Sequence, residues 1–167
     1  MSFRVGSHVV HPHHGVALIE RREKRDMGGE SREYLVLRVD SQDLDVFVPA
    51  ASAETLGLRS LISEDEGFEI LETLGRPARM PKSWARRFKN HTEKLRSGDI
   101  YEAAEVWRNL SVRKRRTQLS AAEGELLARA RMIIVSELCL ALKLSEKEVD
   151  GRLEAALPAP SAKSKAS

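Results

Sequence analysis

The hydrophobic pattern of this 167-residue chain changes once, near Ser63, and the change separates two kinds of structure. Before it, short β-branched and apolar runs are divided by glycine, proline and charged residues. After it, apolar residues recur every three or four positions, which is the spacing of one helix face. We therefore predict an α+β multidomain chain, in which a small antiparallel barrel or strongly bent sheet precedes an all-α bundle of about five helices.

The first 59 residues carry the strand signals. Five short strands are expected, with Gly28 and Gly29 forming a hairpin-type break inside a charged loop. The expected strands cover 3–10, 16–20, 33–39, 44–48 and 56–59. Tight spacing without an intervening helix favours a β-domain over residues 1–59.

Helix-start signals define the rest of the chain. Three Ser-x-x-Glu sequences, at Ser63, Ser120 and Ser145, each precede an apolar periodic segment and predict capping boxes. Ser83 and Asp99 are the expected N-caps of two further helices. We predict a helical domain over 60–157 and, from its Pro, Ala, Ser and Lys content, a disordered tail over 158–167.

Charge is unevenly distributed along the chain. Residues 76–116 contain 13 Lys and Arg against 4 Asp and Glu, a net charge of +9, whereas the remaining residues carry −6. This indicates a localised site for a polyanion, although a solvated helix surface would give the same count. No apolar run reaches the roughly 20 residues of a membrane helix, and no signal peptide is recognisable, so we expect a cytoplasmic protein.

The helix expected after Ser83 combines an aromatic stripe with basic residues. Trp84, Phe88, His91 and Leu95 share one face, and the other faces carry Arg86, Arg87, Lys89, Lys94 and Arg96. Cations are unfavourable in the first turn of a helix, whereas phosphate binds there readily. Trp84 is therefore either a wedge guided by phosphate contacts or part of the core.

Other chemistry has weaker support. The histidines at positions 8, 11, 13 and 14 lack partners at zinc-like spacing, so a metal-dependent enzyme is a minor alternative. The chain has no phosphate-binding loop of the Walker type and no nucleophile elbow. Cys139 is the single cysteine, so no intramolecular disulfide can form. We expect neither a cofactor nor an enzymatic activity.

Ten short segments, spread in order over nearly all of residues 1–157, match a known pattern. They are Phe3-x-Val5-Gly6, Val9-Val10-x-Pro12-x-x-Gly15-Val16, Glu33-Tyr34-Leu35-Val36-Leu37, Val48-Pro49-Ala50, Gly57-Leu58-Arg59, Trp84-x-Arg86-Arg87-Phe88-Lys89, Glu93-Lys94-Leu95-x-Ser97-Gly98-Asp99, Ala104-Glu105-Val106, Ala128-Arg129-Ala130-Arg131 and Glu137-Leu138. In these segments the chain resembles the CarD/CdnL family of bacterial transcription factors.

The resemblance implies a Tudor-like N-terminal domain that binds the RNA polymerase β subunit. It also implies a helical domain that contacts promoter DNA at the upstream edge of the transcription bubble, with Trp84 in the minor groove. The expected polymerase contacts are Arg25 and Phe47. The expected DNA contacts are Trp84, Arg86, Arg87, Lys89, Lys94, Arg113, Lys114, Arg116 and Arg129.

Two positions depart from the family pattern. Phe47 stands where relatives often have a basic residue, and Gly124 stands where some relatives have a DNA-contacting lysine. The missing contact at Gly124 could be replaced by Arg129 or by the basic run 113–116. We expect a monomer. The main alternative is a stand-alone, non-specific DNA-binding protein without a polymerase partner.

Overall fold

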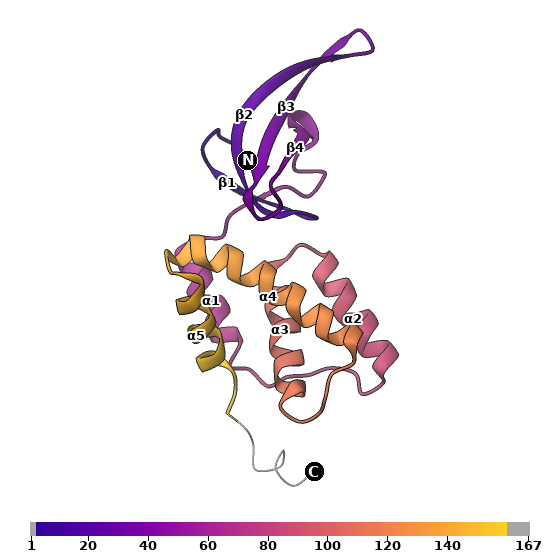
Figure 1. Cartoon of the computed structure of the whole chain (residues 1–167), viewed down its shortest axis with the longest axis vertical. Helices are drawn as coiled ribbons and strands as arrows, with labels where there is room; N and C mark the ends of the chain where they lie inside the picture. The colour runs from indigo at the N-terminus through magenta and orange to yellow at the C-terminus, as the bar shows by residue number, and fades with distance from the viewer. Residues whose placement is uncertain (1–2, 160–167) are drawn as a thin grey trace. The chain divides into compact units, whose positions relative to one another are not determined.

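The structure of the chain is a computed structural model that describes residues 3–159, apart from the side chain of Met27 (Figure 1). It divides into two compact units, with the boundary between Leu61 and Ile62. The sequence placed this boundary after residue 59. Of the tail expected over 158–167, residues 160–167 lie outside the described residues.

The N-terminal unit is a five-stranded antiparallel sheet with the strand order β4-β3-β2-β1-β5. The strands are β1 (His8–His11), β2 (Gly15–Met27), β3 (Glu30–Val39), β4 (Leu44–Pro49) and β5 (Arg59–Ser60). The expected Tudor-like class is confirmed. The segment 3–5 is not a strand, but Phe3 is buried in the core of this unit, and the fifth strand is shorter than expected.

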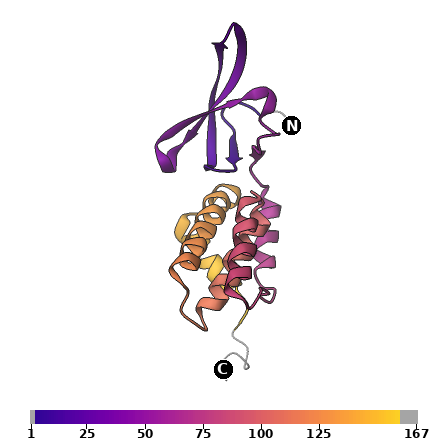
Figure 2. The same ribbon diagram turned by 90° about the vertical axis from the view of Figure 1, so that its right-hand side faces the viewer.

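The β2–β3 hairpin is longer than the sequence indicated, and it extends beyond the other strands of the sheet (Figures 1 and 2). The charged segment expected to be a loop continues both strands, with Arg25 opposite Arg32 and Met27 opposite Glu30. The turn is Gly28–Gly29, and both residues have positive φ, of 63° and 88°. This is the backbone that a two-residue hairpin turn requires. The loop prediction failed because strands with polar residues on both faces show no apolar alternation.

Five helices form the second unit. They are α1 (Glu64–Thr73), α2 (Trp84–Arg96), α3 (Ile100–Lys114), α4 (Ala121–Leu142) and α5 (Glu146–Ala156). Each begins directly after the N-cap that the sequence predicted. The longest helix, α4, contributes Leu126, Ala130, Ile134 and Leu138 to a core shared by all five. No helix within residues 3–159 is long and apolar enough to cross a membrane.

The three predicted capping boxes differ in one respect. Those at Ser63 and Ser145 are complete, with the serine and the glutamate each bonded to the other residue's backbone N–H. At Ser120 only half of the box forms. The Glu123 N–H donates to Ser120 Oγ, but the Glu123 carboxylate bonds to Arg87 on α2 instead. The Glu123 carboxylate thereby joins the start of α4 to α2.

Candidate nucleic-acid interface

Trp84, the first residue of α2, is held in place yet open to solvent. It is 47% exposed, whereas the other tryptophan, Trp107, is 5% exposed and lies in the core. The Trp84 Nε1–H donates to Ser120 Oγ at 3.1 Å. Its ring stacks on Phe88 with 5.1 Å between centroids and 9° between planes. The core interpretation of Trp84 is therefore excluded, because the ring is fixed on the surface.

The start of α2 is fixed by a buried ion pair. Arg87 Nε donates to Glu123 Oε2 at 2.8 Å, and Arg87 Nη2 donates to Glu123 Oε1 at 3.0 Å. Each side chain is only 2% exposed. Arg87 Nη1 also donates to the Lys82 carbonyl at 2.9 Å. One guanidinium thus ties together the connector before α2, the first turn of α2 and the first turn of α4.

Both members of this pair are stabilised as ions. The hydrogen bonds with Glu123 raise the pKa of Arg87. The same bonds hold the pKa of the Glu123 carboxyl below its ordinary value, against the opposing effect of burial. Bidentate arginine–carboxylate pairs are among the strongest charge-assisted hydrogen bonds.

The expectation that Arg87 contacts DNA is not supported by this geometry. Its guanidinium is buried and its donors are used by Glu123 and by backbone carbonyls, so a phosphate cannot reach it. The buried face of α2 consists of Arg87, His91 and Leu95, while Phe88 is half-buried beside it. We therefore leave Arg87 out of the proposed DNA contacts.

His91 and Asn109 continue the buried polar cluster toward α3. The Asn109 amide donates to the Arg79 carbonyl at 3.1 Å and lies 3.3 Å from His91 Nε2. His91 Nδ1 is buried and has no hydrogen-bond partner within residues 3–159. Burial, and secondarily the charge of Lys94, lower the pKa of His91 to about 4. The imidazole is therefore neutral at physiological pH.

Exposed cations lie on α2, the helix that carries Trp84, and in the basic run 113–116. Arg86 and Lys89 are exposed on α2. Lys114 and Arg116 line an open hollow of about 670 Å³ together with Ser120, the residue that accepts the Trp84 hydrogen bond. Gly124 lines the same hollow, so the basic run lies where a lysine side chain at position 124 would project.

The other residues expected to contact DNA either lie near a carboxylate or have no contact that joins them to Trp84. Lys94 Nζ lies 2.7 Å from Glu105 Oε1 on α3. Arg113 is one-third exposed, and its Nε lies 4.0 Å from Glu123 Oε1. Arg129 is exposed on α4, but no contact within the described chain joins it to Trp84. The residues gathered at one place are thus Trp84 and the basic run, with Arg86 and Lys89 on the same helix as the indole.

In the N-terminal unit, the two expected polymerase contacts lie together. The Arg25 guanidinium is 4.1 Å from the centre of the Phe47 ring, a cation–π contact between β2 and β4 across β3. Phe47 is 36% exposed, and Arg25 also lies 3.7 Å from Glu23. The pair forms an exposed patch on the sheet that combines a positive charge with an aromatic ring.

The N-terminal histidines make a local turn. His11 Nδ1 accepts hydrogen bonds from the backbone N–H groups of His13 and His14, at 3.0 and 3.3 Å. Burial, then the charges of His14 and His13, lower the pKa of His11. Within residues 3–159, no three His, Cys, Asp or Glu side chains converge as metal ligands.

Sequence reasoning missed the residues that support the interface. Ser120 and Glu123 were interpreted only as a capping box, and no pattern indicated that Glu123 would pair with Arg87, 36 residues earlier. Asn109, which contacts both His91 and the 74–83 connector, carried no signal at all.

Comparisons with known proteins cover both units. The family described as CarD, C-terminal domain matches residues 68–154. The family described as CarD-like/TRCF RID domain matches residues 3–62. A protein of Bacillus subtilis (strain 168), named "Putative transcription factor YdeB", is 28% identical over 150 residues, which cover 88% of this chain and 97% of that protein.

Proposed function

This chain belongs to the CarD/CdnL family of transcription factors, and from that premise we propose that it stabilises the promoter open complex. In this proposal the N-terminal unit binds the RNA polymerase β subunit, and the helical unit contacts DNA at the upstream edge of the bubble. The family of the N-terminal unit implies interaction with RNA polymerase in general. The β subunit, the DNA contact and the action in the cytoplasm on polymerase-bound promoters are our proposal.

The observation that carries the proposal is the presentation of Trp84. A large apolar ring, 47% exposed, is held by a hydrogen bond and by a stacked phenylalanine at the start of a helix. A ring that is already held in one orientation loses less conformational entropy when it inserts into the minor groove of DNA. A core residue would not be exposed, and an incidental surface residue would not be fixed on two sides.

The physical mechanism is differential binding. Apolar wedges in the minor groove unstack base steps, which costs a few kcal/mol for an intact step. At the fork of a bubble the step is already disrupted, so the wedge favours the open form. A ligand shifts an equilibrium only by its difference in affinity for the two states. A difference of about 1.4 kcal/mol would give tenfold more open complex.

Four exposed cations of the helical unit have a positioning role in this proposal. Arg86, Lys89, Lys114 and Arg116 are exposed and can contact phosphates, which fix orientation without specifying sequence. Affinity for free DNA should therefore be weak, independent of sequence and strongly reduced by salt.

Trp84→Ala tests the proposal. Because Trp84 is half-exposed, the variant should fold and bind polymerase normally, while open-complex lifetime falls by about tenfold. The measurement is promoter-complex decay after addition of a competitor, alongside a thermal melt. Met132→Ala is the matched control, since Met132 is an exposed apolar residue (61%) on α4. An unchanged lifetime in the Trp84 variant would reject the wedge.

The alternative, a stand-alone DNA-binding protein, is distinguished by two other measurements. It requires tight duplex binding by the purified chain at moderate salt, and no dependence of promoter occupancy on the Arg25–Phe47 patch.

A further inference from the structure

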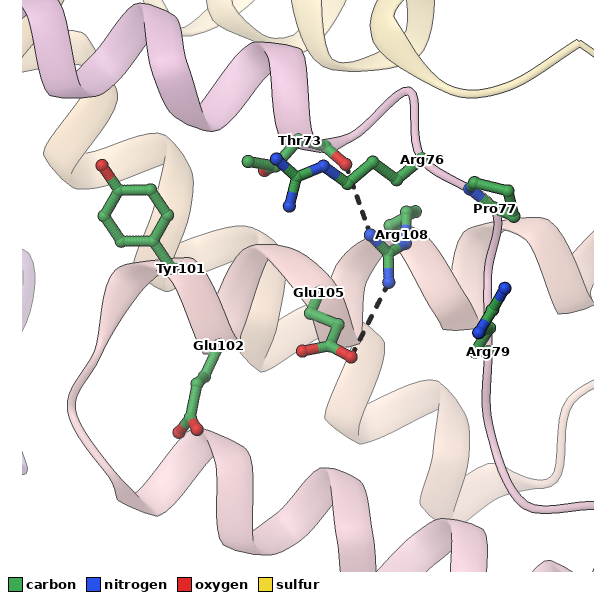
Figure 3. A pocket seen from close by; sticks show the side chains of 8 residues that line it. All are labelled: Thr73, Arg76, Pro77, Arg79, Tyr101, Glu102, Glu105 and Arg108. Atoms are coloured by element: carbon green, nitrogen blue, oxygen red, sulfur yellow. Dashed lines mark hydrogen bonds and ion pairs between the residues drawn. The ribbon is translucent and has the colours of Figure 1, made fainter.

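A second cationic feature of the helical unit is not used by the proposed function. A cavity of about 460 Å³ lies between the end of α1, the 74–83 connector and α3 (Figure 3). Arg76, Arg79 and Arg108 line it, together with Thr73, Tyr101 and Glu105. Its size is within the range of small-ligand sites.

Arg108 is the unusual member of the group because its charge is buried and its ion pair with Glu105 is long and is shared with Lys94. The residue is 7% exposed. Its nitrogens donate to neutral acceptors, namely the Thr73 carbonyl at 3.3 Å and Asn109 Oδ1 at 3.2 and 3.3 Å. The nearest carboxylate oxygen, Glu105 Oε1, is 3.7 Å away and lies closer to Lys94, at 2.7 Å.

The neighbouring charges increase this imbalance. Arg76 and Arg79 are exposed on the connector, and within residues 3–159 no carboxylate is paired with either one. Burial lowers the pKa of Arg108; the charge of Glu105 opposes this effect, and that of Arg76 adds to it. A buried cation that is incompletely paired reduces folding stability, and an anion that enters the cavity would relieve that cost.

We propose that this cavity binds the phosphate group of a small anion, with Arg76, Arg79 and Arg108 as the donors. Guanidinium groups match the oxygens of phosphate in charge and in hydrogen-bond geometry. The site is independent of the proposed DNA contact, so either can fail without the other.

Two features favour a small anion over the DNA backbone. Arg108 is recessed, so a terminal phosphate can reach it more easily than a phosphate within a duplex. Glu102 and Glu105 also line the cavity, and their charges would repel the adjacent phosphates of a continuous polyanion.

The first experiment titrates the full chain with inorganic pyrophosphate at low ionic strength by calorimetry. We expect saturable binding of one pyrophosphate, weakened about tenfold or more in the double variant Arg76→Ala, Arg79→Ala. Both residues are exposed, so this variant should fold. The matched control is Lys147→Ala, Arg152→Ala, which removes the same charge from the exposed surface of α5, outside the cavity, and should bind as the wild type does.

The second experiment separates binding from structure with Arg108→Met. If Arg108 serves the anion, this variant loses the pyrophosphate-dependent rise in melting temperature, and without pyrophosphate it melts no lower than the wild type. A lower melting temperature in the absence of pyrophosphate would mean that Arg108 is a structural residue, and would overturn the proposal.

Three further outcomes would overturn it. The first is no detectable binding of pyrophosphate by the wild type, and the second is equal weakening in the control variant. The third is weaker binding of forked DNA by the Arg76, Arg79 variant with unchanged pyrophosphate binding, which would assign these arginines to DNA.

Discussion

The two units each present an exposed aromatic ring beside an arginine, but they support it in opposite ways. Trp84 lies one turn before Arg87, whose side chain is 2% exposed and is bonded to Glu123. Phe47 lies under Arg25, whose side chain is 49% exposed and whose contacts are at the surface. The position of Trp84 is thus set by the protein interior, whereas the Arg25–Phe47 pair can rearrange against a partner.

This difference has a consequence for substitutions. Changes beneath Trp84 should alter stability and function together, because the same buried groups hold the fold and the ring. Changes at the Arg25–Phe47 patch should alter binding alone.

The largest effect is expected from breaking the buried ion pair on one side. Arg87→Met leaves the Glu123 carboxylate buried without its cation, which should cost about 3–5 kcal/mol of unfolding free energy. Urea denaturation measures this. The double variant Arg87→Met, Glu123→Leu leaves no fully buried charge unpaired, because Arg113, the other cation near Glu123, is one-third exposed, and it should recover most of the loss. If the single variant costs under about 1 kcal/mol, the pair does not hold the site.

The next largest effect is a pH dependence from His91. Its folded pKa of about 4 lies below its ordinary value of 6.5, so the unfolded chain binds the proton more tightly. The stabilisation from a neutral His91 is fully present above pH 6.5 and is lost as the pH falls toward 4. The total contribution of His91 to the free energy of unfolding is on the order of 3 kcal/mol.

Unfolding free energies measured from pH 7.5 to 4.5 test this expectation. His91→Gln keeps a polar side chain without the titration, so the slope between pH 6.5 and 4.5 should flatten. The low pKa of Glu123 adds a further loss only below its ordinary value of 4.5. A slope that is unchanged in the variant would assign the pH dependence to other groups.

Local signals in the sequence were sufficient for the helical unit. Each helix start follows from a capping residue and an apolar period, both of which are local features. The exposure of Trp84 was consistent with its position at the end of an apolar stripe. The burial of Arg87 was not predictable, because an arginine is buried only when a distant residue supplies the counter-charge, and Glu123 lies on another helix.

The hairpin was underestimated for a related reason. Residues 20–27 are mostly charged, so they carry no alternation that would mark a strand. They form one because strand pairing continues from the apolar part of the sheet to the Gly28–Gly29 turn. As a result the sequence placed Arg25 in a loop, and its stacking on Phe47 could not be foreseen.

A smaller effect on stability is expected at the Arg25–Phe47 patch. An exposed cation–π contact contributes about 0.5–1 kcal/mol, so Arg25→Gln should destabilise the chain by no more than this. Binding to the polymerase β subunit should nevertheless weaken severalfold in a pull-down or by interferometry. Lys24→Gln is the matched control, since residue 24 points to the opposite face of β2. Equal weakening in both variants would indicate a general charge effect.

The smallest expected change in stability is a gain from replacing Gly124 with lysine. The same substitution tests whether the surface beside Trp84 contacts DNA. A Cβ atom added there meets no atom within 4 Å, and Gly124 lines the hollow formed by the basic run beside Ser120. In Gly124→Lys, the better helix propensity is worth up to about 1 kcal/mol, and the unfavourable charge near a helix N-terminus offsets about 0.3–1 kcal/mol of it. Stability should therefore change by only a few tenths of a kcal/mol.

DNA binding should respond more than stability does. One added phosphate contact should tighten binding of forked DNA and steepen the dependence of log K on log salt by about 0.9. Gly151→Lys is the matched control, because Gly151 is also an open helical glycine but lies on α5. If both lysines tighten binding equally, the gain reflects net charge, and the basic run beside Trp84 is not the surface that faces the fork. A gain at position 124 alone would locate the DNA at the same helix end that holds the indole, which is what the buried Arg87–Glu123 pair is positioned to support.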